Sequence, residues 1–259
     1  MTTDPVELMN LAARVARVAG DIVIRGRRSG TLDSATKSTA TDMVTKWDGL
    51  SERSIVEAIR SARPSDGIVG EEGTEIPSSS GISWLIDPID GTTNFMYGLS
   101  GYAISIAASD ETGAVAGAVF LPTTRGLFVA ARGHGSWLGE RRLECTKQSD
   151  PSTALVGTGF SYSSTRREQQ GARVARLLPE VRDIRRLGAA APDLCFVADG
   201  RLDAYFEENL SPWDMAAGLL VATEAGAVAS DFGGGPPRPA EILVSAPGLH
   251  SSLLTLLAN

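Results

Sequence analysis

Two carboxylates, Asp87 and Asp90, stand three positions apart directly after a short apolar run. That run, Trp84 to Ile86, has the length and composition of a buried strand. Pro88 has no backbone N–H to donate to a neighbouring strand, so we expect the strand to end on Asp87 and the chain to turn. Gly91 then lets the backbone enter a short helix that begins with hydroxyl residues. The stretch therefore predicts a strand, a turn that carries both carboxylates, and a helix N-terminus.

This turn offers ligands for a cation and for an anion. Carboxylates and the freed carbonyl of Ile89 are the oxygen ligands that Mg²⁺ prefers. The backbone N–H groups of Gly91 and Thr92 lie at the start of the helix, where phosphate binds readily. A plain surface turn is the alternative, because Asp-Pro and Asp-Gly pairs are common in turns. The longer string D-P-I-D-G-T-T-N-F at residues 87–95 is more specific and favours a site for Mg²⁺ beside phosphate.

Three other stretches carry carboxylates that need an explanation. Glu71 and Glu72 are adjacent on a glycine-bounded turn after a short strand, where their charges repel unless a cation neutralises one of them. Asp214 lies in the first turn of a predicted helix, where favourable interaction with the helix dipole is reason enough for a carboxylate. Asp48 follows a polar loop that runs into a helix capped by Thr45. For Asp214 and Asp48, a structural role and a chemical role both stay open at this point.

Four separated motifs occur in one order along the chain. They are K-x-x-x-x-D-x-V-T-x-x-D at residues 37–48, G-E-E at 70–72, the string at 87–95, and W-D-x-A-A-G at 213–218. Together they resemble the inositol monophosphatase family, which is part of the Mg²⁺-dependent, Li⁺-sensitive sugar-phosphate phosphatases. The resemblance implies the family's layered α-β-α-β-α sandwich, of mixed α+β and α/β class. Residues 1–148 would form an α+β half with an antiparallel sheet and most metal ligands, and residues 149–259 an α/β half with the substrate pocket.

The resemblance also implies which residues bind metal and which act on water. Two or three Mg²⁺ ions per site are implied, and their ligands would be Glu71, Asp87, the Ile89 carbonyl, Asp90 and Asp214. Thr92, oriented by Asp48, and Glu71 would position the attacking water, so that no covalent phospho-enzyme is needed. The supporting residues would be Lys37, Asp42 and Glu72.

The substrate-binding positions implied by the same resemblance come from both halves. Gly91 and Thr92 would bind the phosphate oxygens, and Glu207 would bind a sugar hydroxyl. The remaining pocket positions are Gly188, Ala189, Ala190, Ser161 and Asp214. Ala189 is a departure, because many inositol monophosphatases have Ser or Thr there, and Pro192 follows three residues later. The missing hydroxyl predicts an enzyme that discriminates less among small polyol phosphates.

The composition limits the expected partners and location. The net charge is −7, and the densest cationic segment, Arg182 to Arg186, is interpreted as a strand with one solvent-facing side. We therefore expect no nucleic-acid partner. No apolar run reaches membrane-spanning length, and the two cysteines, Cys145 and Cys195, do not form a disulfide framework. The expected location is the cytoplasm, without membrane association, and the resemblance implies a homodimer.

The predicted function is Mg²⁺-dependent hydrolysis of inositol monophosphate, or of related small polyol phosphates, to the alcohol and inorganic phosphate. Relatives with the same metal-binding motifs hydrolyse fructose 1,6-bisphosphate, histidinol phosphate or phosphoadenosine phosphate, so these alternatives stay open. Glu207 and the segment from Arg185 to Gly188 favour inositol monophosphate, and no extra basic residues for a bisphosphate are evident near the pocket. A regulatory scaffold that kept the fold is the alternative from another class. Loss of a metal carboxylate would favour it, and none is lost.

Overall fold

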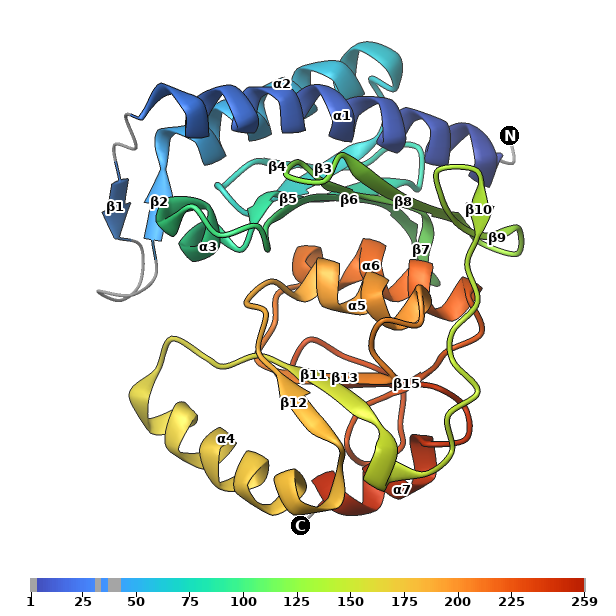
Figure 1. Ribbon diagram of the computed structural model, residues 1–259. Helices are drawn as coiled ribbons and strands as arrows, with labels where there is room; N and C mark the ends of the chain where they lie inside the picture. The colour runs from blue at the N-terminus through green and yellow to red at the C-terminus, as the bar shows by residue number, and fades with distance from the viewer. Residues whose placement is uncertain (1–3, 31–33, 37–42, 259) are drawn as a thin grey trace.

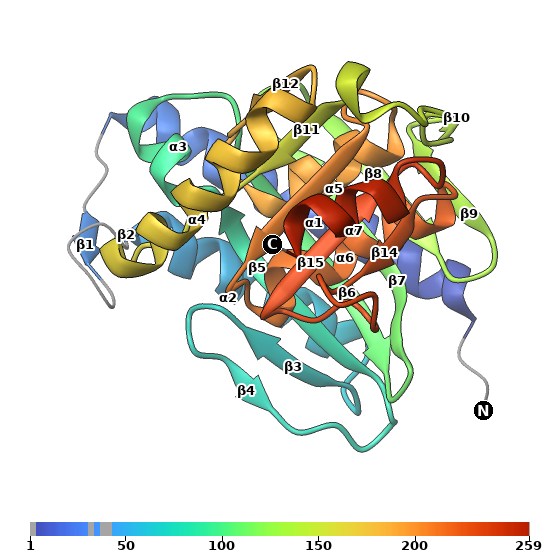
Figure 2. The ribbon, with the colours of Figure 1, turned by 90° about the horizontal axis from the view of Figure 1, so that it is seen from below.

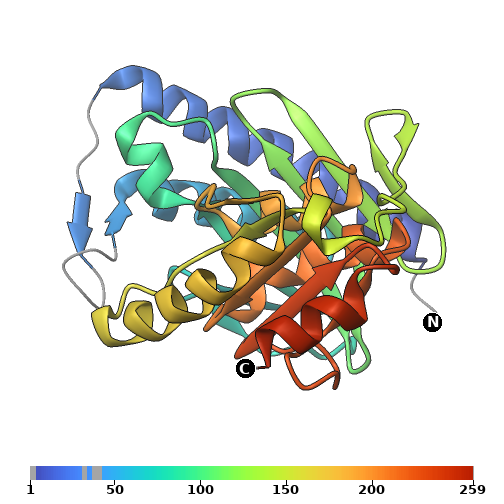
Figure 3. The ribbon, with the colours of Figure 1, turned by 60° about the horizontal axis from the view of Figure 1, so that its bottom comes forward.

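The computed structural model describes residues 4–30, 34–36 and 43–258, which form five layers (Figure 1). Helices α1 and α2 cover a first sheet, helices α5 and α6 lie between that sheet and a second one, and α4 and α7 cover the far face of the second sheet (Figure 1). Figure 3 shows α4 and α7 side by side on that outer face. The helix bounds are α1 Pro5–Ser29, α2 Lys46–Ala62, α3 Thr92–Tyr97, α4 Ser164–Leu177, α5 Ala190–Ala198, α6 Pro212–Glu224 and α7 His250–Leu257, with 3-10 helices at Pro151–Thr153 and Leu178–Glu180. The predicted α-β-α-β-α sandwich is confirmed.

The first sheet has eight strands in the order β10-β9-β8-β7-β6-β5-β3-β4, and β3 and β4 form one edge (Figure 2). Neighbouring strands are antiparallel except β3 and β5, which are parallel. The bounds are β3 Gly67–Gly70, β4 Glu75–Ile76, β5 Ser83–Asp90, β6 Ala103–Asp110, β7 Gly113–Leu121, β8 Gly126–Ala131, β9 Gly135–Leu138 and β10 Arg141–Arg142. Strands β6, β7 and β8 form a continuous antiparallel run.

The predicted end of the central strand at Asp87 is wrong. Strand β5 continues through Pro88 to Asp90, and its pairing with β6 shifts register between Asp87 and Asp90. A proline is tolerated inside a strand at such an irregularity, because no ladder hydrogen bond is then required of it. The consequence for the site is that both carboxylates stand on the strand itself, and Gly91 alone makes the turn into α3. Gly91 has φ +87°, a left-handed conformation that favours glycine.

The second sheet is mixed. Its five strands lie in the order β12-β11-β13-β15-β14, and β11 is parallel to both β12 and β13, whereas β15 is antiparallel to β13 and β14. The bounds are β11 Leu155–Thr158, β12 Asp183–Arg185, β13 Ala204–Glu208, β14 Val228–Ser230 and β15 Glu241–Ser245. The sequence analysis did not predict β14, which is only three residues long.

A small antiparallel pair of strands precedes α2. Strands β1 (Ser34–Thr36) and β2 (Met43–Thr45) pair with each other, where the sequence predicted only a polar loop. The two supporting residues Lys37 and Asp42 fall between these strands and lie outside the described residues. Their predicted roles therefore stay predictions.

The first two helices have side-chain caps at their N-termini, and the predicted capping of the second helix by Thr45 is confirmed. The side chain of Asp4 accepts from the Val6 N–H at the start of α1, and Gly30 ends the helix with φ +72°. Thr45 and Asp48 form a capping box at the start of α2.

Within residues 4–30, 34–36 and 43–258, each helix is either too short or too polar to span a membrane.

The largest apolar cluster crosses the proposed boundary at residue 148. Ala103 and Val119 of the first sheet pack in one buried group with Leu194 of α5, Val221 of α6 and Tyr205 of the second sheet. Helices α5 and α6 therefore share their burial with both sheets. The division into halves at 1–148 and 149–259 stays a prediction, although the strands of each main sheet all fall on one side of it.

Candidate active site

A pocket of about 530 Å³ lies where the two sheets and the central helices meet. Its walls come from the end of β5, the start of α3, the loop after β11, the start of α5, the end of β13 and the start of α6. Twelve of the predicted site residues line it: Glu71, Asp87, Ile89, Asp90, Gly91, Thr92, Ser161, Gly188, Ala189, Ala190, Glu207 and Asp214. Asp48 and Glu72 do not line the pocket, and Asp48 contacts it through Thr92.

Four carboxylates face one another across this pocket. Asp87 and Asp90 are 2% and 8% exposed, and the pKa of each is raised well above its ordinary value. Burial is the largest cause for both, followed by the charge of Glu71 for Asp87 and the charge of Asp214 for Asp90. Groups that repel one another in this way lower their energy when a cation shares them. The donor set of carboxylate oxygens with the Ile89 carbonyl is the chemistry that a hard divalent cation requires.

Backbone N–H groups hold three of these carboxylates in place. Asp87 Oδ1 accepts from Ile89 N at 3.0 Å, and Asp214 Oδ2 accepts from Ser211 N at 2.7 Å, which completes a capping box on α6. Among the described residues, no group of three or more His, Cys, Asp or Glu side chains is already arranged to hold a metal ion. The chemical types of the donors therefore suit a cation, but their present arrangement is not a complete coordination shell. Asp214 has both the capping role and the pocket position that the sequence left open.

Asp90 connects the two halves of the molecule. Its carboxylate accepts from Ala190 N at 3.3 Å and from Ala191 N at 2.6 Å, both at the start of α5. Ala189, the residue before that helix, supplies no side-chain cap of its own. The N-terminus of α5 is thus capped by a carboxylate from the first sheet, at the position where the sequence lacks a hydroxyl.

Asp48 lies beneath the pocket and contacts Thr92. Thr92 Oγ1 is 3.1 Å from Asp48 Oδ1 and 3.0 Å from the Ile89 carbonyl oxygen, so its one hydroxyl hydrogen can be donated to either. Asp48 Oδ2 accepts from both the N–H and the hydroxyl of Thr45, at 2.8 and 2.6 Å. Complete burial raises the pKa of Asp48. The contact between Asp48 and Thr92 is present as predicted, and their role with water stays a prediction.

Glu207 forms the opposite wall of the pocket. Burial raises the pKa of Glu207 to about 7, and a hydrogen bond from the Tyr205 hydroxyl and the charge of Arg186 act in the other direction. A Cβ at Gly159 would collide with the Glu207 carboxylate, so that glycine makes room for it. A carboxyl with this pKa can both donate and accept hydrogen bonds near neutral pH, which suits a ligand hydroxyl.

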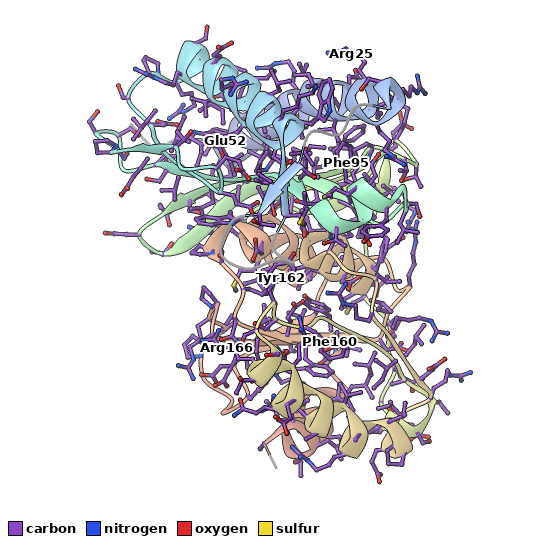
Figure 4. The ribbon with its side chains drawn as sticks, turned by 90° about the vertical axis from the view of Figure 1, so that its left-hand side faces the viewer. Arg25, Glu52, Phe95, Phe160, Tyr162 and Arg166 are labelled. Carbon is purple, nitrogen blue, oxygen red and sulfur yellow. The ribbon has the colours of Figure 1, made fainter. Side chains whose placement is uncertain are left out.

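Two arginines that the sequence analysis did not assign also line the pocket. Arg186 and Arg166 are both exposed, and Arg166 donates to the side chain of Asn209. Figure 4 shows Tyr162 and Arg166 near the start of α4. The expectation that the pocket lacks extra basic residues is therefore wrong. Strand β12 ends at Arg185, so Arg186 belongs to the loop before α5 rather than to a solvent-facing strand.

Part of the signal for Arg186 was present in the sequence. The adjacent pair Arg185 and Arg186 was visible, and the glycine at 188 indicated that the strand ends early. Arg166 carries no such signal, because it stands in an ordinary polar stretch and reaches the pocket only through the packing of α4. Ser161, in the loop between β11 and α4, does line the pocket and donates its N–H to Gln170.

The same layered fold occurs in "Thermotoga maritima IMPase TM1415", which superimposes with a TM-score of 0.89 at 29% identity and covers 97% of each chain. The model of the family described as "Inositol monophosphatase family" matches residues 4–259. The chain belongs to the inositol monophosphatase family.

Individual relatives are similar over most of their length. The chain is 42% identical to "Inositol-1-monophosphatase SuhB" of Mycobacterium tuberculosis (strain ATCC 25618 / H37Rv), covering 98% of this chain and 94% of the relative. It is 41% identical to "Nus factor SuhB" of Pasteurella multocida (strain Pm70), covering 88% and 86%. The crystal structure of the extragenic suppressor protein suhB from Bartonella henselae superimposes with a TM-score of 0.92 at 33% identity, covering 97% of this chain and 98% of the other.

Proposed function

We propose that the protein is a Mg²⁺-dependent phosphomonoesterase that hydrolyses inositol monophosphate, or a related small polyol phosphate, to the alcohol and inorganic phosphate. The observation that carries the proposal is the placement of Glu71, Asp87, Asp90 and Asp214 around one pocket. Their mutual repulsion favours bound divalent cations, as a phosphatase of this type requires. Metal dependence is general to the family. The identity of the metal as Mg²⁺, and two or three ions per site, are part of the proposal.

The proposed metal ligands are Glu71, Asp87, the Ile89 carbonyl, Asp90 and Asp214. When bound, the cations supply positive charge that lowers the pKa of a water and stabilises the departing oxyanion. Asp90 and Asp214 accept hydrogen bonds from backbone N–H groups, which hold both carboxylates at the wall of the pocket.

The residues of the chain itself orient the reacting groups. Asp48 fixes the hydroxyl of Thr92, and we propose that this hydroxyl and the Glu71 carboxylate orient the attacking water. The water oxygen bonds to phosphorus and the water gives up one proton, while the bond from phosphorus to the alcohol oxygen breaks and that oxygen takes up one proton. No covalent phospho-enzyme forms. The N–H groups of Gly91 and Thr92 are proposed to bind the phosphate oxygens that do not react.

The alcohol part of the substrate is proposed to lie between Glu207 and the start of α5. Glu207 would bind a sugar hydroxyl, and Gly188, Ala189, Ala190 and Ser161 would surround the ring. Arg186 and Arg166 on the same wall favour a second candidate, a substrate with an additional anionic group such as a sugar bisphosphate. Monophosphate hydrolysis remains the first candidate, because the family and the Mycobacterium relative are named for it.

Release of inorganic phosphate from a panel of substrates tests the proposal. The panel contains inositol 1-phosphate, glycerol 2-phosphate, fructose 1,6-bisphosphate, histidinol phosphate and 3′-phosphoadenosine 5′-phosphate, each with Mg²⁺ and with EDTA. We expect the largest kcat/KM for inositol 1-phosphate and no turnover in EDTA. Full activity in EDTA would contradict the metal-dependent mechanism, and turnover of the bisphosphates alone would favour the second candidate.

The proposed assembly is a homodimer without a nucleic-acid partner. Because the Pasteurella relative is named "Nus factor", the proposed lack of a nucleic-acid partner needs a direct test. Sedimentation at micromolar protein should give twice the mass of 27.2 kDa. RNA should not bind at physiological salt, where a chain of net charge −7 lacks the cations that such binding needs.

A further inference from the structure

Helix α2 has a completely buried polar face at its start. Asp48 and Ser51 are 0% exposed and Glu52 is 3% exposed, and these positions lie on one side of the helix. One and two turns further on, the same side of the helix carries Ile55 and Ile59, the usual residues of a core-facing stripe. Buried polar groups cost free energy unless they are hydrogen-bonded, so this polar face needs a specific reason.

Each of the three side chains contacts a different segment of the candidate site. Asp48 contacts Thr92, as described above. Ser51 Oγ donates to the carbonyl of Pro88 at 3.1 Å, on the strand between the two carboxylates. Glu52 reaches the loop after β3, and Figure 4 places it beneath α2 on the side that faces the strands. One helix thus contacts every part of the first half that contributes to the metal-binding pocket.

The contacts of Glu52 are the most extensive. Its Oε2 accepts from Glu72 N at 2.8 Å, and its Oε1 accepts from Thr74 N at 3.2 Å and from Thr74 Oγ1 at 2.6 Å. Both carboxylate oxygens are therefore used, and all three donors belong to the loop that carries Glu71. Charge-assisted hydrogen bonds of this kind are stronger than neutral ones.

The loop is shaped to receive this carboxylate. A Cβ at Gly70 would collide with Glu52, so the glycine of the G-E-E motif is required for the close approach of the two segments. Gly70 N donates to Thr74 O at 2.8 Å, which closes the loop around the Glu52 carboxylate. Glu71 N donates to Ile86 O of β5 at 3.1 Å. Glu71 is thus fixed from both sides, by β5 and by the loop that Glu52 organises.

We propose that Glu52 is a positioning residue that places Glu71 for metal binding, with Ser51 in a smaller role at Pro88. This inference rests on the proposed function, because it takes Glu71 to be a metal ligand. A residue that orients a ligand contributes to metal affinity without touching the ion, and loss of such a contact weakens affinity by about 10- to 100-fold. The alternative is a purely structural residue, whose loss lowers stability and leaves metal affinity unchanged in the molecules that remain folded.

The test is Glu52→Gln, which keeps the size of the side chain and replaces one acceptor oxygen by a donor. The amide N–H₂ then faces a backbone N–H or the Thr74 hydroxyl, and one bond to the loop is lost. Calorimetric titration with Mn²⁺ measures metal affinity independently of turnover. We expect about a tenfold weaker Kd in Glu52→Gln, a matching rise in the Mg²⁺ concentration that gives half-maximal rate, and kcat at saturating metal within about threefold of the wild type.

Glu57→Gln is the matched control, because Glu57 lies on the exposed side of the same helix. It should bind Mn²⁺ as the wild type does. If Glu52→Gln does not fold, Thr74→Val removes one of the three donors and keeps Glu52, and it should weaken Mn²⁺ binding by a smaller factor. Unchanged Mn²⁺ affinity in a folded Glu52→Gln or Thr74→Val protein would overturn the inference.

The outcomes separate this inference from the proposed function. If the wild type hydrolyses no substrate of the panel and Glu52→Gln still weakens Mn²⁺ binding, the positioning role stands and the proposed activity fails. If the wild type is an active Mg²⁺-dependent phosphatase and Glu52→Gln binds Mn²⁺ normally, the activity stands and the positioning role fails.

Discussion

The proposed metal side of the pocket and its proposed alcohol side are built in different ways. The proposed metal side comprises Asp48, Glu71, Asp87, Asp90, Thr92 and Asp214. These residues stand at or next to strand ends and helix starts, and backbone groups or buried side chains hold several of them. The alcohol side comprises Ser161, Arg166, Arg186, Ala189 and Glu207, of which two are exposed arginines and several come from loops.

The difference indicates that one side of the site positions the phosphate and the other side selects the alcohol. Groups that handle phosphate must stand at fixed distances from one another, so they are placed on regular elements with many hydrogen bonds. Groups that select the alcohol can vary on loops without disturbing that framework. Substitutions on the metal side should therefore reduce the rate for every substrate, and substitutions on the alcohol side should change the preference among substrates.

The largest effect is expected from Asp90→Asn and Asp214→Asn. Each removes a carboxylate charge from the proposed metal site, so turnover should fall by about a hundredfold or more for every substrate, as it should in EDTA. Both variants should fold. Asn at 214 keeps an oxygen for the Ser211 N–H, and Asn at 90 keeps an oxygen for the shorter bond from the Ala191 N–H and loses only the longer bond from the Ala190 N–H. Phosphate release and circular dichroism measure the two properties.

Asp21→Asn is a suitable control, since Asp21 is an outer residue paired with Arg125. The comparison between the two sides breaks down if either site variant retains wild-type turnover, or if it reduces turnover for one substrate only.

The next effect concerns pH and Glu207. The pKa of Glu207 rises from its ordinary value of 4.5 to about 7 in the folded protein, so the folded state binds its proton more tightly than the unfolded state does. The contribution of Glu207 to stability is therefore fully present below pH 4.5 and is lost progressively as the pH rises from 4.5 to 7. The total loss is on the order of 3 kcal/mol.

Glu207→Gln removes the ionisation and keeps an acceptor for the Tyr205 hydroxyl. In urea denaturation with EDTA present, the variant should gain stability relative to the wild type as the pH rises from 4.5 to 7, and the difference should be constant above pH 8. A stability difference that does not change with pH would show that Glu207 has the same pKa in the folded and unfolded states, as a solvated carboxylate has.

The metal side could be predicted from the sequence because its residues are fixed by local chemistry. Asp87, Asp90 and Gly91 are adjacent in the chain, and only a few backbone paths accommodate that string. The one error there, the end of β5 at Asp87, arose because a proline usually ends a strand, whereas this sheet accommodates it at a shift in register.

The residues that the sequence missed depend on packing between distant segments. Glu52 contacts Glu72 and Thr74 some twenty positions away, and nothing in its own neighbourhood distinguishes it from the exposed Glu57. Arg166 likewise reaches the pocket from the start of α4. Short strands such as β14 were missed because their pairing partner supplies most of the order.

A smaller effect is expected from Arg186→Gln on the alcohol side. If Arg186 binds a second anionic group, its loss removes a charge-assisted contact worth about 1.5–3 kcal/mol. The KM for fructose 1,6-bisphosphate should then rise about tenfold or more relative to the KM for inositol 1-phosphate. Arg185→Gln is the control, because Arg185 is exposed and pairs with Asp183. An equal rise in KM for both substrates would place Arg186 with the phosphate-binding groups instead and blur the distinction between the two sides.

The smallest effect is expected from Ala189→Ser, which restores the hydroxyl that the sequence lacks. A new hydroxyl at the start of α5 would normally cap the helix by accepting from the second or third N–H. Here the third residue is Pro192, which has no N–H, and the N–H of Ala191 already donates to Asp90 at 2.6 Å. The hydroxyl is therefore left to face the pocket, where Ala189 is a lining residue.

A hydrogen bond from this hydroxyl to the substrate is worth roughly 0.5–1.5 kcal/mol. The kcat/KM for inositol 1-phosphate should rise several-fold relative to that for glycerol 2-phosphate, and the ratio of the two substrates in one protein sample serves as its own control. Thermal unfolding separates the other possibility. If Ser at 189 displaces Asp90 and caps α5, stability and metal affinity change while the substrate ratio does not. Residue 189 then belongs to the metal side, because its effect acts through Asp90 on every substrate alike.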